Sequence, residues 1–159
     1  MLTKNRQGKT LILGIGNPLM GDDGAGIRIA DELTQYPLPD HVIVEEAGLP
    51  GLGLPAWLEG WSSVILIDAV DMGLAPGAFR RFHPAEVRLF AQDGVLSLHQ
   101  PDLANGLALS EALDILPEEV IIYGIQPAHT IPGQELSQAV HSAIPDMINT
   151  LLEDIRREE

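Results

Sequence analysis

The chain has 159 residues and a formal net charge of −14, from 23 acidic residues against nine lysines and arginines, and it contains no cysteine. This charge disfavours nucleic acid as a partner, and the missing cysteines exclude disulfides, thiolate metal sites and a cysteine nucleophile. The sequence has no apolar run of the ~20 residues needed to span a bilayer and no signal-peptide core at its N-terminus, so we expect a cytoplasmic protein without membrane insertion.

The pattern of apolar residues predicts strands that alternate with helices. Short continuous apolar runs such as TLILGIG and SVILIDA indicate strands, and apolar residues that recur every three or four positions indicate helices. In chain order we expect a strand at 10–16, a helix at 23–35, a strand at 42–46, a short helix around 56–59, a strand at 63–69, an edge strand at 78–83, a helix at 102–116, a strand at 120–126 and a long final helix from about Gln134.

This alternation predicts the fold class. We expect one α/β domain over residues 1–159, with frayed ends at 1–9 and 156–159. Its architecture is a three-layer α/β/α sandwich around a mostly parallel, mixed five-stranded sheet. The strand at 78–83 is expected to be antiparallel because the turn before it is too short for a crossover. In the helix at 102–116, the side chains expected to face the sheet are those of Leu103, Leu107, Leu109 and Leu113.

A glycine-rich loop, GIGNPLMGDDGAG at 14–26, follows the first strand. G-x-G after a strand can make room for a pyrophosphate, but Leu19 replaces the third glycine of that fingerprint, and Asp22 and Asp23 would repel phosphates. Carboxylates at a helix start instead act as caps beside the positive end of the helix. We expect capping from Asp22, and a function for Asp23 only in combination with distant partners.

An aspartate ends the apolar run at 63–69. A carboxylate at the end of a buried strand is costly unless it is paired, hydrogen-bonded or bound to a metal, which makes Asp68 a candidate functional residue. Asp71, which follows shortly after, is expected to serve the turn.

The third candidate is a histidine in SLHQPDLANGLAL, at 97–109. His99 precedes a predicted helix and lies in a loop, where functional side chains concentrate. A nucleophile pair of Ser97 with His99 is rejected, because no nucleophile elbow or oxyanion motif surrounds Ser97. The other four histidines are expected to be surface or structural residues: His41, His83, His129 and His141.

These three candidates converge in the predicted fold. Asp23, Asp68 and His99 each close a segment that predicts a buried strand or its following loop, and such ends meet at one edge of an open α/β sheet, where ligands bind. Two carboxylates and an imidazole suit a borderline divalent metal, and three ligands leave coordination positions open.

Four segments carry a family resemblance: GNPLMGDDGAG, the aspartate strand with DMGLAPG, the histidine loop, and YGIQP at 123–127. Together they resemble the hydrogenase maturation endopeptidases, which process the large subunit of nickel-iron hydrogenases. The double aspartate, DMGL-x-PG and GIQP particularly resemble the branch that serves formate-hydrogenlyase-type and other energy-converting hydrogenases. The resemblance implies a phosphorylase/hydrolase-like fold, with Asp23, Asp68 and His99 at the positions that engage nickel. Glu46 departs from the family, which usually has aspartate before two glycines there, and is left out of the site.

The resemblance implies an endopeptidase, aspartyl-type or metal-dependent, that removes a C-terminal extension from the large-subunit precursor after nickel insertion. Nickel borne by the substrate would be both the recognition signal and a transient cofactor. Without thiolates the protease would bind nickel less firmly than the cysteine-rich centre of its substrate. We expect a monomer. Whether the metal polarises the carbonyl or a carboxylate activates water stays open at this point.

Three other functions fit parts of the sequence. A non-proteolytic nickel chaperone or assembly factor would use the same three residues, although the histidine-rich tracts or thiols typical of nickel carriers are missing. Peptidyl-tRNA hydrolases also begin with a strand followed by G-x-GNP, but here no histidine closely follows that motif and the charge of −14 disfavours tRNA. A nucleotide-binding module has the least support.

Overall fold

A five-stranded sheet forms the centre of the protein, in a computed structural model that describes residues 6–87 and 101–157. The strands, in their order across the sheet, are β2 (Val42–Gly48), β1 (Thr10–Ile15), β3 (Ser63–Ala69), β5 (Glu119–Ile125) and β4 (Phe79–Phe82). The pairs β1–β2, β1–β3 and β3–β5 are parallel, whereas the edge strand β4 is antiparallel to β5. The expected mostly parallel, mixed sheet with an antiparallel edge strand is confirmed.

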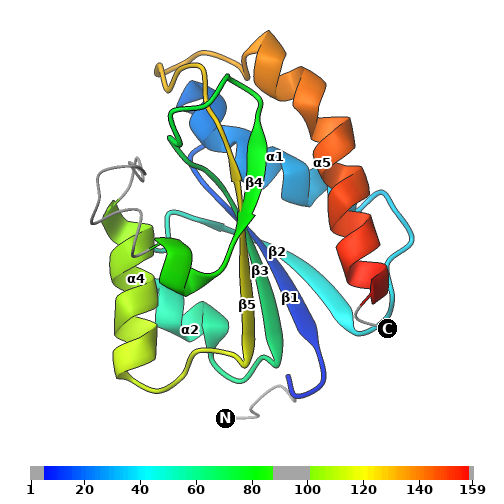
Figure 1. Cartoon of the computed structure of the whole chain (residues 1–159), viewed down its shortest axis with the longest axis vertical. Helices are drawn as coiled ribbons and strands as arrows, with labels where there is room; N and C mark the ends of the chain where they lie inside the picture. The colour runs from blue at the N-terminus through cyan, green and yellow to red at the C-terminus, as the bar shows by residue number, and fades with distance from the viewer. Residues whose placement is uncertain (1–5, 88–100, 158–159) are drawn as a thin grey trace.

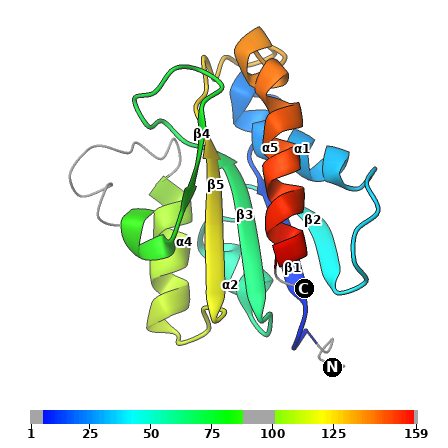
Figure 2. The ribbon, with the colours of Figure 1, turned by 45° about the vertical axis from the view of Figure 1, so that its right-hand side comes forward.

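Helices cover both faces of this sheet. Helices α1 (Ala25–Leu33) and α5 (Gln138–Arg157) lie on one face, and α2 (Leu54–Leu58) and α4 (Pro101–Ala112) lie on the other (Figures 1 and 2). Two short 3-10 turns, η1 (Gly21–Gly24) and η2 (Gly51–Gly53), precede α1 and α2. This is the expected three-layer α/β/α sandwich. No helix in the described ranges is long and apolar enough to cross a membrane.

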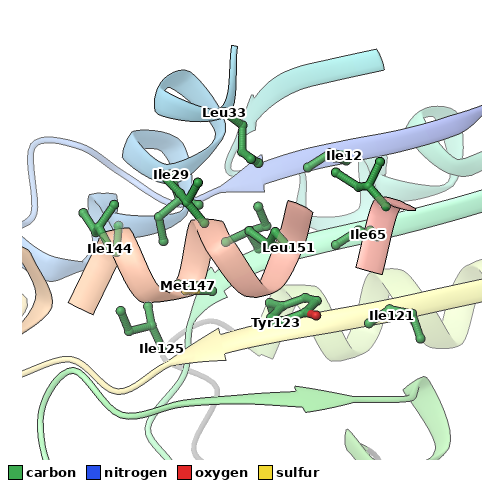
Figure 3. Close-up of a cluster of buried hydrophobic side chains, with 14 of the residues drawn as sticks. Ile12, Ile29, Leu33, Ile65, Ile121, Tyr123, Ile125, Ile144, Met147 and Leu151 are labelled. Atoms are coloured by element: carbon green, nitrogen blue, oxygen red, sulfur yellow. The ribbon is translucent and has the colours of Figure 1, made fainter. Parts of the chain in front are cut away.

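Each face of the sheet has its own apolar core, because successive strand residues point to opposite sides. On β1, Leu11 and Leu13 pack with α2 and α4, whereas Ile12 packs with α1 and α5. Figure 3 shows the second core, in which Ile29 of α1 and Leu151 of α5 lie over the sheet. Every residue of β1 and β3 is buried, so the continuous apolar runs reflect a strand covered on both sides.

Polar side chains connect helix α5 to strands β4 and β5. The hydroxyl of Tyr123 on β5 donates a hydrogen bond to Asp154 on α5, and Arg81 on β4 forms an ion pair with the same carboxylate, with 3.2 Å between Nε and Oδ2. Burial, followed by the bond to Asp154, raises the pKa of Tyr123 above its ordinary value. The edge strand, its neighbour and the last helix therefore meet at one carboxylate.

The bounds of α1, α2 and α5 differ from the sequence prediction. Helix α1 starts at Ala25 rather than at 23, because residues 21–24 form the 3-10 turn η1. Helix α5 starts at Gln138 rather than near 134, and the backbone N–H of Ser137 instead donates to Asp22. Helix α2 covers 54–58 in place of 56–59.

The prediction that Leu113 faces the sheet was wrong. Helix α4 ends at Ala112, four residues before the expected end at 116. Asp114 has a φ of 56°, in the left-handed region that commonly ends a helix. Leu113 therefore leaves the helical face that buries Leu103 and Leu107, and it is 55% exposed.

Glycines in the loop after β1 let the backbone of that loop and of α1 lie directly on the ends of the central strands. A Cβ at Gly26 would lie 2.3 Å from the carbonyl oxygens of both Ile15 and Ile67. Gly16 has a φ of +140°, and a Cβ there would lie 1.9 Å from the carbonyl oxygen of Asp23. In this protein the glycine-rich motif therefore serves close backbone packing at the carboxyl ends of β1 and β3.

We expect Gly26→Ala to lower the free energy of unfolding by about 1–3 kcal/mol or more, because the added methyl must displace backbone atoms of two central strands. Gly53→Ala is the matched control: nothing lies within 4 Å of its added Cβ, and its φ of −81° suits alanine. The control should leave stability unchanged or raise it by about 0.4–1 kcal/mol. Urea unfolding of both variants tests this, and equal stability of the two would contradict the packing argument.

Candidate functional site

The candidate site lies at the carboxyl edge of the sheet, between β1 and β3. The chain leaves β1 through α1 toward β2 on one side, and β3 lies on the other side of β1. Such a reversal of strand order opens a crevice at the carboxyl ends, where open α/β sheets bind ligands. The loops after β1, β3 and β5 lie together at the top of Figures 1 and 2.

Asp23 belongs to the 3-10 turn η1, and its side chain is oriented by the loop that precedes it. The backbone N–H of Asn17 donates to Oδ2 of Asp23 at 3.0 Å, while Oδ1 of Asn17 accepts the N–H of Leu19 at 3.0 Å. Asp23 is only 5% exposed. It does not cap α1, whose N-terminus has no side-chain cap. The loop therefore holds the Asp23 carboxylate almost out of contact with solvent.

Asp68 is the second-last residue of β3, a strand that is buried throughout, and it is 6% exposed. Burial raises the pKa of the Asp68 carboxyl well above its ordinary value, the negative charge of Asp23 raises it further, and the backbone N–H of Ala69 partly opposes the rise. The structure thus brings Asp23 and Asp68 close enough for the charge of one to act on the other.

Two buried carboxylates of like charge cannot both stay ionised without cost. The pair can relieve that cost by holding a proton on one member or by sharing a cation. In the first state, ionised Asp23 can accept a proton from water while protonated Asp68 can donate one. In the second state, both supply oxygen ligands to a divalent metal.

His99, the third predicted ligand, lies outside the described residues, as does Ser97. Within 6–87 and 101–157, no group of three histidine, aspartate or glutamate side chains comes together as a metal site. The two aspartates are therefore the part of the predicted site whose geometry the structure gives.

Asp22 does not cap the helix, contrary to prediction. Its carboxylate is completely buried and accepts three backbone N–H groups: Oδ2 from Ala128 at 2.8 Å and His129 at 3.3 Å, and Oδ1 from Ser137 at 2.7 Å. Its own N–H donates to the carbonyl of His129 at 3.0 Å. The cap is lost because the loop after β5 presents these three donors to the same carboxylate. Asp22 thereby joins the loop after β5 to the loop that carries Asp23.

Gln126, directly after β5, fixes the loop after β3. Its Oε1 accepts the N–H of Met72 at 2.6 Å and of Leu74 at 3.3 Å, and its Nε2 donates to Oδ1 of Asp71 at 3.1 Å. Asp71 also accepts the N–H of Gly73 at 3.1 Å, which confirms it as a turn residue. The sequence predicted no role for Gln126 beyond its place in GIQP, because a single sequence does not distinguish a buried glutamine from an exposed one.

Among the described residues, none of the four other histidines forms a three-residue metal site with the two aspartates. His83 and His141 are exposed and His41 is half-buried, as expected for surface or structural residues. His129 is half-buried, and its Nδ1 has no hydrogen-bond partner among the described residues. That ring packs on Gly21, whose added Cβ would lie 2.6 Å from Nδ1.

Two hollows flank the loops of the site. One, of about 610 Å³, is lined by Pro18, Gly21, Gly24, Ile27, Arg28, Asp31, Glu46, Glu135, Leu136 and His141. The other, of about 340 Å³, is lined by Asp71, Gln126, Pro127, Ala128, His129 and Thr130. Among the described residues, neither lining includes Asp23 or Asp68.

We expect Asp68→Asn to stabilise the fold at neutral and alkaline pH. Folding raises the pKa of Asp68, so protonated Asp68 contributes favourably to the free energy of unfolding at low pH. This contribution is lost as the pH rises through the raised pKa. Asparagine is neutral throughout and avoids that loss. Urea unfolding at about pH 8 and about pH 5 should show a gain that shrinks on acidification. Asp40→Asn, at an exposed position, should show no such gain; a gain independent of pH would contradict this account.

We expect Asp22→Asn to destabilise the protein, because an amide has one acceptor oxygen where the carboxylate uses two. Each buried backbone N–H left without an acceptor costs about 1–3 kcal/mol. Asp31→Asn, on the exposed face of α1, should change stability by less than about 0.5 kcal/mol. Denaturant unfolding gives both values, and hydrogen exchange should show faster opening at residues 128–137 in Asp22→Asn alone. Hydrogen exchange at the wild-type rate in that loop of Asp22→Asn would refute the role assigned to Asp22.

Comparisons with known proteins identify relatives of this chain. A family model described as hydrogenase maturation protease matches residues 27–154, which includes Asp68 and position 99, while Asp23 precedes the match. The hydrogenase expression/formation protein HupD of Bradyrhizobium diazoefficiens is 34% identical over 128 residues, which are 80% of this chain and 67% of that protein. The hydrogenase 2 maturation protease of Escherichia coli is 30% identical, over 93% of this chain and 91% of that protein. The solved structure of the hydrogenase maturating endopeptidase HybD from Escherichia coli superposes with a TM-score of 0.83, at 28% identity, over 94% of this chain and 93% of that one.

Proposed function

Because the chain belongs to the hydrogenase maturation protease family and is an endopeptidase, we propose that it removes the C-terminal extension from a nickel-iron hydrogenase large-subunit precursor. The observation that carries the assignment of the site is the neighbouring pair of buried carboxylates, Asp23 and Asp68, at the carboxyl edge of the sheet. We assign catalysis to this pair together with His99. The branch of the family, the monomeric state and the cytoplasmic location stay predictions from the sequence.

Nickel enters this proposal as part of the substrate. Asp23, Asp68 and His99 approach the nickel of the precursor and thereby distinguish it from the nickel-free form. The electrostatics of the pair support this role, because a divalent cation relieves the repulsion between two desolvated carboxylates. Oxygen ligands compete weakly with thiolates for nickel, so the metal stays in its cysteine-rich centre when the product leaves.

The two carboxylates can divide the proton transfers of peptide hydrolysis. Ionised Asp23 accepts a proton from the attacking water, whose oxygen bonds to the scissile carbonyl carbon. Asp68, whose pKa is raised by burial and by Asp23, donates a proton to the leaving nitrogen as the C–N bond breaks. Proton transfer from Asp23 to Asp68 then restores the starting state. Nickel engages the pair during recognition of the precursor, and the proton transfers take place when it no longer occupies both carboxylates.

The proposal predicts that Asp23→Asn, Asp68→Asn and His99→Ala each slow the processing of a nickel-loaded precursor by about 100-fold or more, since each removes a proton-transfer or nickel-binding group. The measurement is mass spectrometry of the precursor C-terminus over time, with circular dichroism to show that each variant is folded. His83→Ala and His141→Ala, at exposed positions, should process normally.

Nickel-free precursor incubated with the wild-type protein should stay uncleaved. Processing by Asp23→Asn at the wild-type rate would remove the assignment of the site. If the wild-type protein transferred nickel to the precursor without any loss of mass, the chain would be a chaperone instead of the proposed processing enzyme.

A further inference from the structure

Exposed apolar side chains gather at the edge of the sheet that carries the candidate site. Seven large apolar residues in the described ranges are more than a third exposed. Five of them lie on the segments that follow the carboxyl ends of β1, β2, β3 and β5; we call them the apolar rim: Leu19, Leu49, Leu52, Leu74 and Ile131. The other two, Tyr36 and Leu113, lie in the helix-to-strand loops after α1 and α4, at the opposite edge of the sheet.

The loops of the rim are held by specific hydrogen bonds. The carbonyl of Leu19 accepts the N–H of Gly133 at 2.9 Å, which joins the loop after β1 to the loop that bears Ile131. The N–H of Leu74 donates to Oε1 of Gln126 at 3.3 Å. The N–H of Gly16 donates to the carbonyl of Gly48 at 2.8 Å and joins the β2 segment to the same edge. The backbone therefore fixes the positions from which these side chains project.

The exposure of these residues is unusual for this chain. Single exposed leucines are common on soluble proteins, but several on neighbouring loops of one edge indicate an interaction surface. Leu19 is 74% exposed and Leu52 is 67% exposed, in a protein whose formal charge is −14. The chain thus has abundant charge for its surface and yet exposes these five apolar side chains at this edge.

On the basis of the proposed function, we propose that the apolar rim docks the folded body of the large-subunit precursor, through an apolar surface around the base of its C-terminal extension. Leu19 lies on the loop that carries Asp23, and Leu74 lies on the segment after Asp68. Leu49, Leu52 and Ile131 lie on the other segments at the same edge of the sheet, so a chain that reaches the carboxylates passes near the rim. The carboxylates are only 5% and 6% exposed, and a scissile segment must therefore be held down firmly to reach them. Apolar contacts remote from the reacting atoms supply binding energy for that positioning.

A second copy of this chain is the alternative occupant. It would cover the loops that carry the carboxylates and so obstruct the substrate. The precursor is favoured because docking on the rim brings it to the site instead of blocking it.

The test uses a nickel-loaded large-subunit precursor that the wild-type protein cleaves. Leu19→Gln, Leu52→Gln and Ile131→Gln should each raise the KM for this precursor roughly tenfold, since each removes an apolar contact of the docked complex. The value of kcat/KM should fall by at least the same factor, because the lost contacts also help to hold the scissile segment at the carboxylates. Binding to a precursor truncated at the cleavage site should weaken in parallel.

Tyr36→Gln and Leu113→Gln are the matched controls. Leu113 matches Ile131 in exposure, because the two side chains are 55% and 53% exposed. Both controls should leave KM and kcat unchanged. Equal KM values for rim and control variants would overturn the docking inference and leave the proposed function standing. Failure of the wild-type protein to cleave any such precursor would overturn both. Concentration-dependent dimers that dissociate in the rim variants, without an effect on KM, would assign the rim to self-association and also overturn the inference.

Discussion

The structure depends on holding two carboxylates, Asp23 and Asp68, near each other and out of water. Their mutual repulsion and desolvation oppose folding, so the surrounding backbone must enforce the arrangement. Gly16 and Gly26 make this possible, because only glycine lets the loop and the start of α1 lie on the backbone of β1 and β3. The same close packing buries the carboxylates. A cost in stability is therefore built into the position of the candidate site, as is common for functional groups that must change charge or bind a metal.

Two polar side chains keep this edge rigid. Asp22 joins the loops after β1 and β5, and Gln126 joins the end of β5 to the loop after β3. Their hydrogen bonds among the described residues all go to backbone groups or to Asp71, so these side chains orient the loops and leave the chemistry to other residues. Adjacent Asp22 and Asp23 thus have separate tasks although they carry the same side chain. Their difference arises from the direction each takes in the 3-10 turn, where one faces the loop after β5 and the other faces Asn17.

The sequence predicted the sheet well because both faces of β1 and β3 are covered, which requires uninterrupted apolar runs. It also predicted that Asp23 and Asp68 converge, since parallel strands bring their ends to one edge. It failed where a local pattern competes with distant contacts. Asp22 has the composition of a helix cap, yet residues 128–137 offer it better donors. Leu113 continues a helical apolar spacing, yet the left-handed Asp114 ends the helix before it. His99 lies outside the described residues, so its role stays a prediction from the sequence.

Net charge and apolar contacts act at different distances in the recognition of the substrate. The charge of −14 acts over distance, and it repels acidic partners before contact. It is screened within about 8 Å at physiological salt and cannot position a peptide to the accuracy that hydrolysis requires. Contacts of the apolar rim act only at close range, and they lie on segments at the same edge of the sheet as the carboxylates rather than at the reacting atoms. A substrate without a matching apolar surface would stay above the buried pair, whereas a matching one would press its scissile segment toward Asp23 and Asp68. If the substrate docks on the rim as proposed, the deep burial of the carboxylates makes access to them depend on that docking and thereby serves selectivity.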